Sequence, residues 1–88
     1  MLFMVIENYR NAKLVYQRFF EKGRMMPEGL NYVASWVEIE GDRCFQVMEC
    51  DDSKLLHKWA SNWQDIVDFE FIPVLTSKEF SGKMEAEI

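Results

Sequence analysis

Residues 30 to 50 read LNYVASWVEIEGDRCFQVMEC, two runs rich in β-branched and aromatic residues with a glycine and an aspartate between them. Residues of these types favour strands. Glycine readily adopts the positive φ angle that a tight turn needs, so Gly41 and Asp42 join a strand at 30–39 to a strand at 43–50. We therefore predict an antiparallel hairpin in the middle of the chain.

One strand and one helix lie on each side of this hairpin. Residues 2–7 are apolar on both alternating faces, which predicts a central strand, and residues 9–22 place apolar side chains at helical spacing. After the hairpin, a second amphipathic helix starts within residues 51–53, and a last strand spans 66–75. Residues 77–88 predict a short polar tail with about one helical turn.

The predicted order β-α-β-β-α-β is that of the ferredoxin-like α+β fold, an antiparallel four-stranded sheet with two helices on one face. The first and third strands are then central, residues 1–76 form one domain and residues 77–88 a C-terminal tail. The uncovered face of the sheet would carry apolar and aromatic side chains. A contiguous exposed apolar patch usually marks an interface, so we predict a homodimer formed through this face.

Composition excludes two classes of partner. The chain has 88 residues, 15 acidic and 10 basic, for a net charge of −5. Nucleic-acid binding needs clustered lysine and arginine, and a membrane span needs about 20 consecutive apolar residues, so we expect neither partner. The first strand begins at Met1 with no basic segment before it, which favours a cytoplasmic protein.

Cysteine and histidine usage argues against a disulfide or a metal site. Cys44 and Cys50 lie six positions apart on one predicted strand, about 20 Å at 3.3 Å per residue. A disulfide needs Cα atoms within about 7 Å, so both thiols should be reduced. His57 is the single histidine and falls on the exposed side of its helix, so we expect no metal and no cofactor.

Four segments carry a family resemblance. MLFMVIE (1–7), GLNYVASWVE (29–38), CFQVMECDD (44–52) and WQDIVDFEFIPV (63–74) resemble, in this order, an uncharacterised bacterial family catalogued as domain of unknown function 3303. The resemblance covers residues 1 to about 75 and implies the dimeric α/β-barrel superfamily, whose members pair through ferredoxin-like sheets. That superfamily includes small monooxygenases, muconolactone isomerases and haem-dependent peroxidases. Their catalytic motifs do not match this chain residue by residue, so the resemblance implies fold and dimer more than an activity.

Candidate ligand-binding residues lie mainly on the hairpin. Tyr32 and Trp36 could line a small-molecule pocket, whose walls are often aromatic, although core or interface packing is the commoner role of such residues. Gln46 is an amide within an apolar strand and must find hydrogen-bond partners, in a ligand or elsewhere in the protein. Glu49 and Glu7 end the central strands. If one is buried, its pKa rises and it can act as a general base, whereas strand ends usually reach water.

Side-chain alternation assigns part of each sheet face. The more apolar sets of the third and fourth strands should meet the helices, which places Gln46, Asp68 and Glu70 toward the dimer side. Trp59 and Trp63 lie on the apolar stripe of the second helix and are expected in the core. The second strand divides into two sets whose faces stay unassigned: Tyr32, Ala34 and Trp36, and Val33, Ser35 and Val37.

Two functions fit these observations. The leading hypothesis is a cofactor-free homodimer that binds or transforms a small, partly apolar molecule by isomerisation or oxygenation, with Tyr32, Trp36, Gln46 and Glu49 as positioning groups. The alternative is a non-enzymatic interaction module. Residues 10–24 carry five basic groups and one acidic group, and residues 38–52 carry six acidic groups and one basic group. A basic helix or an acidic hairpin could therefore bind another protein, and whether the chain is an enzyme stays open.

Overall fold

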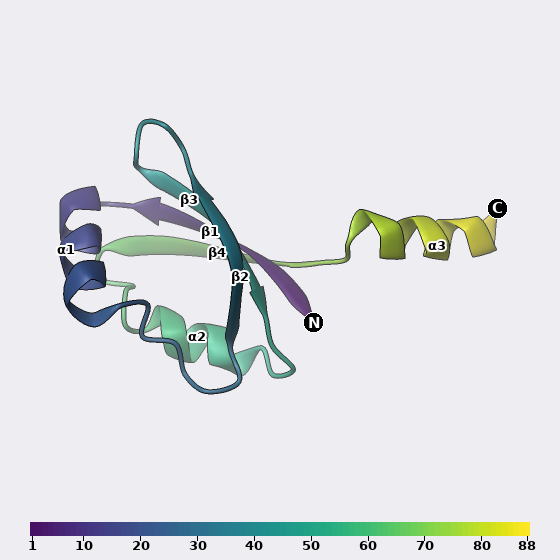
Figure 1. Cartoon of the computed structure of the whole chain (residues 1–88), viewed down its shortest axis with the longest axis horizontal. Coiled ribbons are helices and arrows are strands. Elements are labelled where there is room, and N and C mark those ends of the chain that lie inside the picture. Colours follow the sequence, from purple (N-terminus) through teal and green to yellow (C-terminus); the bar gives the residue numbers. More distant parts are fainter.

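The computed structural model describes residues 1–88 and contains four strands and three helices (Figure 1). The first six elements follow the order β-α-β-β-α-β, which confirms the predicted ferredoxin-like α+β fold. Neither length nor hydropathy would let any of the three helices cross a membrane. In chain order the elements are β1 (Leu2–Tyr9), α1 (Ala12–Lys22), β2 (Asn31–Val37), β3 (Arg43–Glu49), α2 (Lys54–Ala60), β4 (Val67–Val74) and α3 (Ser77–Glu87).

The sheet has the strand order β2-β3-β1-β4 and is antiparallel throughout. The first and third strands are therefore central, as predicted. Residues paired across neighbouring strands point to the same face. Val5 of β1, for example, pairs with Gln46 of β3 and with Phe71 of β4, so the side chains of all three face the same way.

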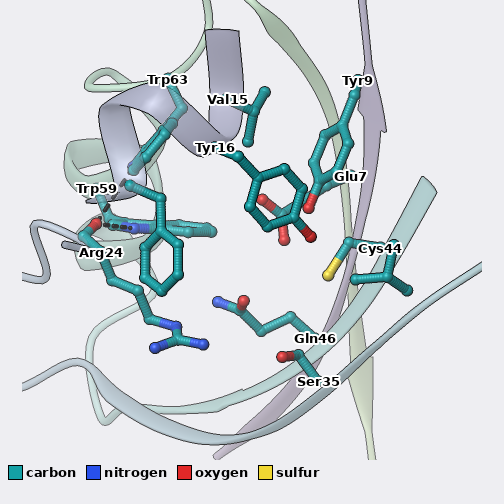
Figure 2. Close-up of a pocket in the computed structure, with 12 residues that line it drawn as sticks. Glu7, Tyr9, Val15, Tyr16, Arg24, Ser35, Cys44, Gln46, Trp59 and Trp63 are labelled. Carbon is teal, nitrogen blue, oxygen red and sulfur yellow. Dashed lines mark hydrogen bonds between the residues drawn. The ribbon is translucent and has the colours of Figure 1, made fainter. Parts of the chain in front are cut away.

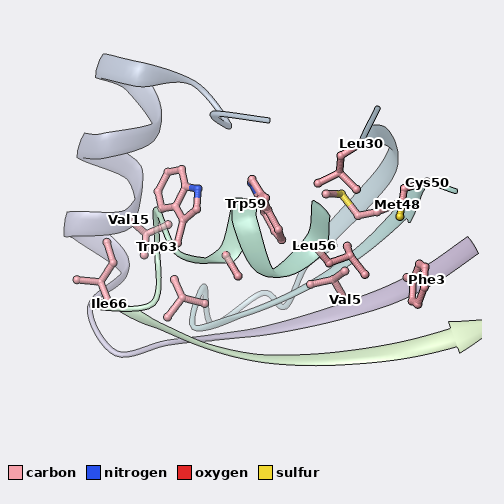
Figure 3. Close-up of a cluster of buried hydrophobic side chains, with 12 residues drawn as sticks. Phe3, Val5, Val15, Leu30, Met48, Cys50, Leu56, Trp59, Trp63 and Ile66 are labelled. Carbon is pink, nitrogen blue, oxygen red and sulfur yellow. The ribbon is translucent and has the colours of Figure 1, made fainter. Parts of the chain in front are cut away.

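Helices α1 and α2 pack on one face of the sheet, here called the covered face (Figure 3). Val15 of α1 joins Leu56 and Trp59 of α2 in a single buried cluster. After α2 the chain continues as a series of turns, which bring Trp63 and Ile66 into the same cluster. On the two central strands the covered face ends at the partly exposed Tyr9, and its other residues are all buried: Phe3, Val5, Glu7, Cys44, Gln46 and Met48.

The opposite face, here called the open face, has no element packed on it within the chain (Figure 1). Asp68 and Glu70 of β4 lie there, as predicted, but Gln46 does not. The prediction for Gln46 was wrong because the uncharged set of β3 meets the helices, whereas Phe45 and Val47 share their face with the charged Arg43 and Glu49. The apolar residues of the open face are all at least partly exposed: Leu2, Met4, Ile6, Ala34, Trp36, Phe45, Val47, Ile72 and Val74.

A bulge in β2 changes which residues of this strand share a face. The register with β3 shifts between Tyr32, which pairs with Met48, and Ala34, which pairs with Val47. One extra residue, Val33, is therefore inserted, and Tyr32 lies on the covered face with Ser35, where their hydroxyl groups are 2.7 Å apart. Simple alternation had placed Tyr32 with Trp36, and that grouping is wrong.

The C-terminal residues form a full helix rather than the predicted polar tail with one turn. Thr76 caps α3, and its side chain and that of Glu79 form a reciprocal capping box. This helix has no buried residue and projects away from the sheet (Figure 1). The radius of gyration is accordingly 14.7 Å, whereas about 12 Å is typical of a compact chain of this length.

Candidate functional site

A cavity of about 80 Å³ lies between the covered face and the two helices, and we call it the Glu7 pocket (Figure 2). Apart from Tyr9 of β1, its partly exposed lining residues come from α1, the following loop and edge strand β2, so the pocket opens to solvent between α1 and β2. Its lining combines aromatic walls with a few polar groups, as in small-molecule sites. The lining residues are Glu7, Tyr9, Val15, Tyr16, Phe19, Arg24, Ser35, Val37, Cys44, Gln46, Trp59 and Trp63.

Glu7 is the buried carboxyl group of this pocket, with 7% of its surface exposed. It lies on the central strand β1, and its neighbours across the sheet are Cys44 and Phe69. Burial raises the pKa of Glu7 to about 7, against the weaker lowering effects of a hydrogen bond with Cys44 and the charge of Arg24. The sequence predicts a raised pKa for a strand-end carboxyl group that is buried, and Glu7 is buried. Near neutral pH this group can therefore both accept and donate a proton.

Tyr9 and Cys44 surround Glu7 and stay protonated at neutral pH. Burial, followed by the charge of Glu7, raises the pKa of the Cys44 thiol to about 12. The same two causes raise the pKa of Tyr9 above its ordinary value. A thiol with a raised pKa is a poor nucleophile, so Cys44 acts here as a neutral neighbour of the carboxyl group. Cys44 and Cys50 are both free, as predicted, and both are buried.

Gln46 lies in the pocket with a weak hydrogen-bond partner. Its Nε2 donates to the Met48 sulfur at 2.8 Å, and a thioether is a poor acceptor. Gln46 is only 5% exposed, so solvent water has little access to its amide. A polar ligand atom in the pocket would therefore be a better hydrogen-bond partner for this amide. Of the four residues predicted from the sequence to bind a ligand, Gln46 is the one that lines the cavity.

Trp59 and Trp63 are buried in the core, as predicted, and they also form one wall of the pocket. Both indole N–H groups donate to the backbone carbonyl of Arg24, at 2.9 Å and 3.2 Å. The next residue, Met25, has a positive φ of 57°, an uncommon conformation for a side chain of this size. The two tryptophans therefore fix the loop between α1 and β2 in a strained shape at the mouth of the pocket.

The other predicted ligand-binding residues lie elsewhere. Tyr32 is at the rim, where the Arg24 guanidinium carbon lies 3.9 Å from its ring centroid. Trp36 is on the open face opposite Phe45 and is 60% exposed. Glu49 is also on the open face, and a hydrogen bond from Asn31 at 2.9 Å is the largest of the effects that lower its pKa. The structure thus brings Gln46 and Tyr32 near one another and separates both from Trp36 and Glu49.

Sequence reasoning missed the contributions of Tyr9, Tyr16 and Arg24 to the pocket. The sequence offered one usable signal, because Glu7 shares the alternation of Phe3 and Val5 on a strand apolar on both faces. A carboxyl group in such a set is unusual and indicates a functional position.

The single histidine and the metal-ligating residues form no site. His57 is exposed and lies edge-on to Phe71, with ring centroids 5.1 Å apart. The chain contains no group of three or more histidine, cysteine, aspartate or glutamate side chains placed to hold a metal ion.

The basic helix predicted as an alternative binding surface is partly neutralised within the chain. Arg10 pairs with Asp68 at 2.8 Å, and Arg18 pairs with Asp65 through two bonds of 2.8 Å. Hydrogen bonding from Arg18 lowers the pKa of Asp65 to about 2. Part of the excess positive charge of residues 10–24 is therefore neutralised by carboxylates from other segments of the chain.

The fold and the pocket together define a ferredoxin-like α+β domain with a buried carboxyl group in a partly aromatic cavity. Comparison with family models identifies one match, the domain of unknown function DUF3303, over residues 1–88. The chain belongs to this family, and the match extends through α3, beyond the segments that carried the sequence resemblance. Comparisons with curated proteins and with solved structures give no match.

Proposed function

We propose that the protein binds a small, partly apolar molecule in the Glu7 pocket and that Glu7 exchanges a proton with it. The observation that carries this proposal is a carboxyl group that is 7% exposed and lines an accessible cavity. A buried carboxyl group is costly unless neutralised, and perturbed acids in clefts are concentrated at functional sites. The aromatic walls provide contact area for the apolar part of the ligand.

Proton transfer by Glu7 needs no cofactor. The carboxylate would take a proton from a carbon next to a carbonyl group of the ligand, whose C–H electron pair becomes an enolate. Where a carbon–carbon double bond of the ligand is conjugated with the enolate, returning the proton to the far end of that bond isomerises the ligand, and no atom is gained or lost. The protonated Tyr9 hydroxyl and the Gln46 amide line the same cavity and can donate hydrogen bonds to the enolate oxygen.

The size of the cavity limits the ligand. A closed apolar cavity of about 150 Å³ takes one benzene molecule. The Glu7 pocket encloses about 80 Å³, so it holds roughly half as many heavy atoms. Any larger ligand must leave part of itself at the mouth between α1 and β2.

We further propose that the open faces of two copies pair to form the homodimer. The support is the set of partly exposed apolar side chains, including Met4, Phe45 and Val47, that continues across the neighbouring strands of this face. Sedimentation equilibrium should give twice the chain mass for the wild type and the mass of one chain for Val47→Glu. A wild-type monomer at the highest concentration tested would refute this assembly.

Native mass spectrometry of the freshly purified protein tests the pocket. We expect an added mass that is lost on denaturation and absent from Ser35→Phe, whose ring would enter the pocket. Ala34→Phe is the matched control because the adjacent side chain lies on the open face. Retention of the added mass by Ser35→Phe, or its loss from Ala34→Phe alone, would contradict the proposal.

Isotope exchange tests the role of Glu7 once that ligand is identified from its mass. In D₂O the wild type should introduce deuterium at carbon, and Glu7→Gln should bind the ligand without doing so. Equal exchange by both proteins would show that Glu7 is not the proton acceptor.

A further inference from the structure

Arg24 is the exception among the four arginines of the chain. It has no carboxylate within ion-pairing distance, although acidic residues outnumber basic ones by 15 to 10. The other three are each paired in the structure: Arg10 with Asp68, Arg18 with Asp65, and Arg43 with Glu38.

The guanidinium group of Arg24 is held in place by aromatic rings. Its central carbon lies 3.9 Å from the ring centroid of Tyr32 and 5.1 Å from that of Phe19. Such stacking uses the flat faces of the guanidinium and leaves its N–H edge free to donate hydrogen bonds. The backbone of Arg24 is fixed as well, because its carbonyl accepts both tryptophan indole bonds. Figure 2 shows the side chain at the pocket, on the same side as Gln46 and Ser35.

We infer that Arg24 is an anion-binding residue and that the ligand of the Glu7 pocket is a small monocarboxylate. Its carboxylate pairs with the Arg24 guanidinium at the mouth. Its short, mostly apolar chain, which carries the carbonyl group that the proposed proton transfer needs, enters the cavity between the tryptophans and α1. This inference rests on the proposed function and adds the chemical class of the ligand. An unpaired, pre-positioned guanidinium beside a cavity is the observation that carries it.

A monocarboxylate fits this site better than a phosphate does. Arg24 is the single basic residue among the lining residues, so the site supplies one positive charge. The planar fork of a guanidinium matches a carboxylate with two parallel hydrogen bonds. A phosphate group would bring about two negative charges next to Glu7, with no second cation to balance them.

The groups around Glu7 make binding of an anion dependent on pH. Tyr9 faces it from β1, Cys44 from β3, Tyr16 from α1 and Arg24 from the loop, and Arg24 carries the one positive charge. An ionised Glu7 repels a second carboxylate, whereas a protonated Glu7 does not. Since the pKa of Glu7 is about 7, monocarboxylate binding should tighten as the pH falls from 8 to 6.

A matched pair of probes tests the inference. Butyrate and butyramide have the same shape and differ in charge, and NMR titration follows each through the indole N–H signals of Trp59 and Trp63. Trp36, on the opposite face, is the control within the molecule. We expect butyrate to bind at least about tenfold more tightly than butyramide. This preference should disappear in Arg24→Gln and persist in Arg43→Gln, whose guanidinium is already paired with Glu38.

The outcomes separate this inference from the proposed function. If both probes shift Trp59 and Trp63 equally, or if Arg24→Gln keeps the preference for butyrate, the role of Arg24 is refuted while the pocket remains a binding site. If neither probe shifts these signals at concentrations up to 100-fold above the protein, the inference and the small-ligand pocket both fail. Unfolding of Arg24→Gln is not expected, because the backbone carbonyl that anchors the loop is retained.

Discussion

The two faces of the sheet are built from the same four strands but have opposite environments. On the central strands every covered-face residue from Phe3 to Glu7 and from Cys44 to Met48 is buried, and no open-face apolar residue is. The covered face nevertheless holds the polar Glu7 and Gln46, while the open face holds Leu2, Met4, Ile6, Phe45 and Val47.

This difference shows that hydrophobicity alone does not decide which face is buried. The helices bring Trp59 and Trp63, whose large rings fill the space above the shorter side chains of β3. Burial of Glu7 and Gln46 then follows from packing around them, and both side chains face the cavity that the rings leave. Polar groups kept in a buried position at such cost favour a functional role over a structural one.

Replacing a tryptophan on each face should give the largest contrast. Trp59 is 2% exposed and donates a hydrogen bond to Arg24, so Trp59→Ala should lower the free energy of unfolding by about 3–5 kcal/mol. Trp36 is 60% exposed, and Trp36→Ala should cost less than about 1 kcal/mol at low protein concentration. Urea denaturation followed by far-UV circular dichroism measures both.

The concentration dependence of the Trp36 effect sharpens this comparison. If a second copy covers the open face, the cost of Trp36→Ala should increase with protein concentration, since association stabilises the wild type by mass action. The cost of Trp59→Ala should change less. Equal destabilisation by the two substitutions at every concentration would mean that the faces do not differ as the structure indicates.

The pH dependence of the free energy of unfolding should reveal the buried carboxyl group of Glu7 on the covered face. The pKa of Glu7 rises from 4.5 in the unfolded chain to about 7 in the fold, so the folded state holds an extra proton between these values. Its contribution is complete below pH 4.5 and is lost as the pH rises to about 7. At 1.36 kcal/mol per unit, the loss is about 3 kcal/mol.

Glu7→Gln provides the control for this pH effect. The variant should lack the decline between pH 4.5 and 7, because its amide does not titrate. Asp65 acts in the opposite direction at lower pH, since its pKa of about 2 lies below the ordinary value of 3.8 and its stabilisation is lost on acidification. A wild type that loses no stability between pH 5 and 7 would contradict the burial of Glu7.

The sequence was sufficient for the order of the first six elements and for the central strands, because these depend on periodicity and turn residues within short windows. It was insufficient for Tyr32 and Trp36, because the bulge at Val33 is one inserted residue that leaves the composition of the strand unchanged. Gln46 was assigned to the wrong face because its burial depends on Trp59 of α2 and on Trp63 of the turns that follow it. Arg24 reaches the pocket through a loop whose shape is fixed by those same tryptophans.

Removal of α3 should have only a small effect on the stability of the domain. This helix has no buried residue and lies away from both faces of its own sheet (Figure 1). An isolated helix of 11 residues is only marginally stable in water despite the capping box at Thr76. The free energy of unfolding of a chain that ends at Leu75 should therefore lie within about 1 kcal/mol of that of the full chain. The truncated chain should also lose part of the helical circular dichroism signal. If truncation instead abolished a concentration-dependent part of the stability, α3 would be in contact with a second copy, and the open face would no longer be the sole candidate for the interface between chains.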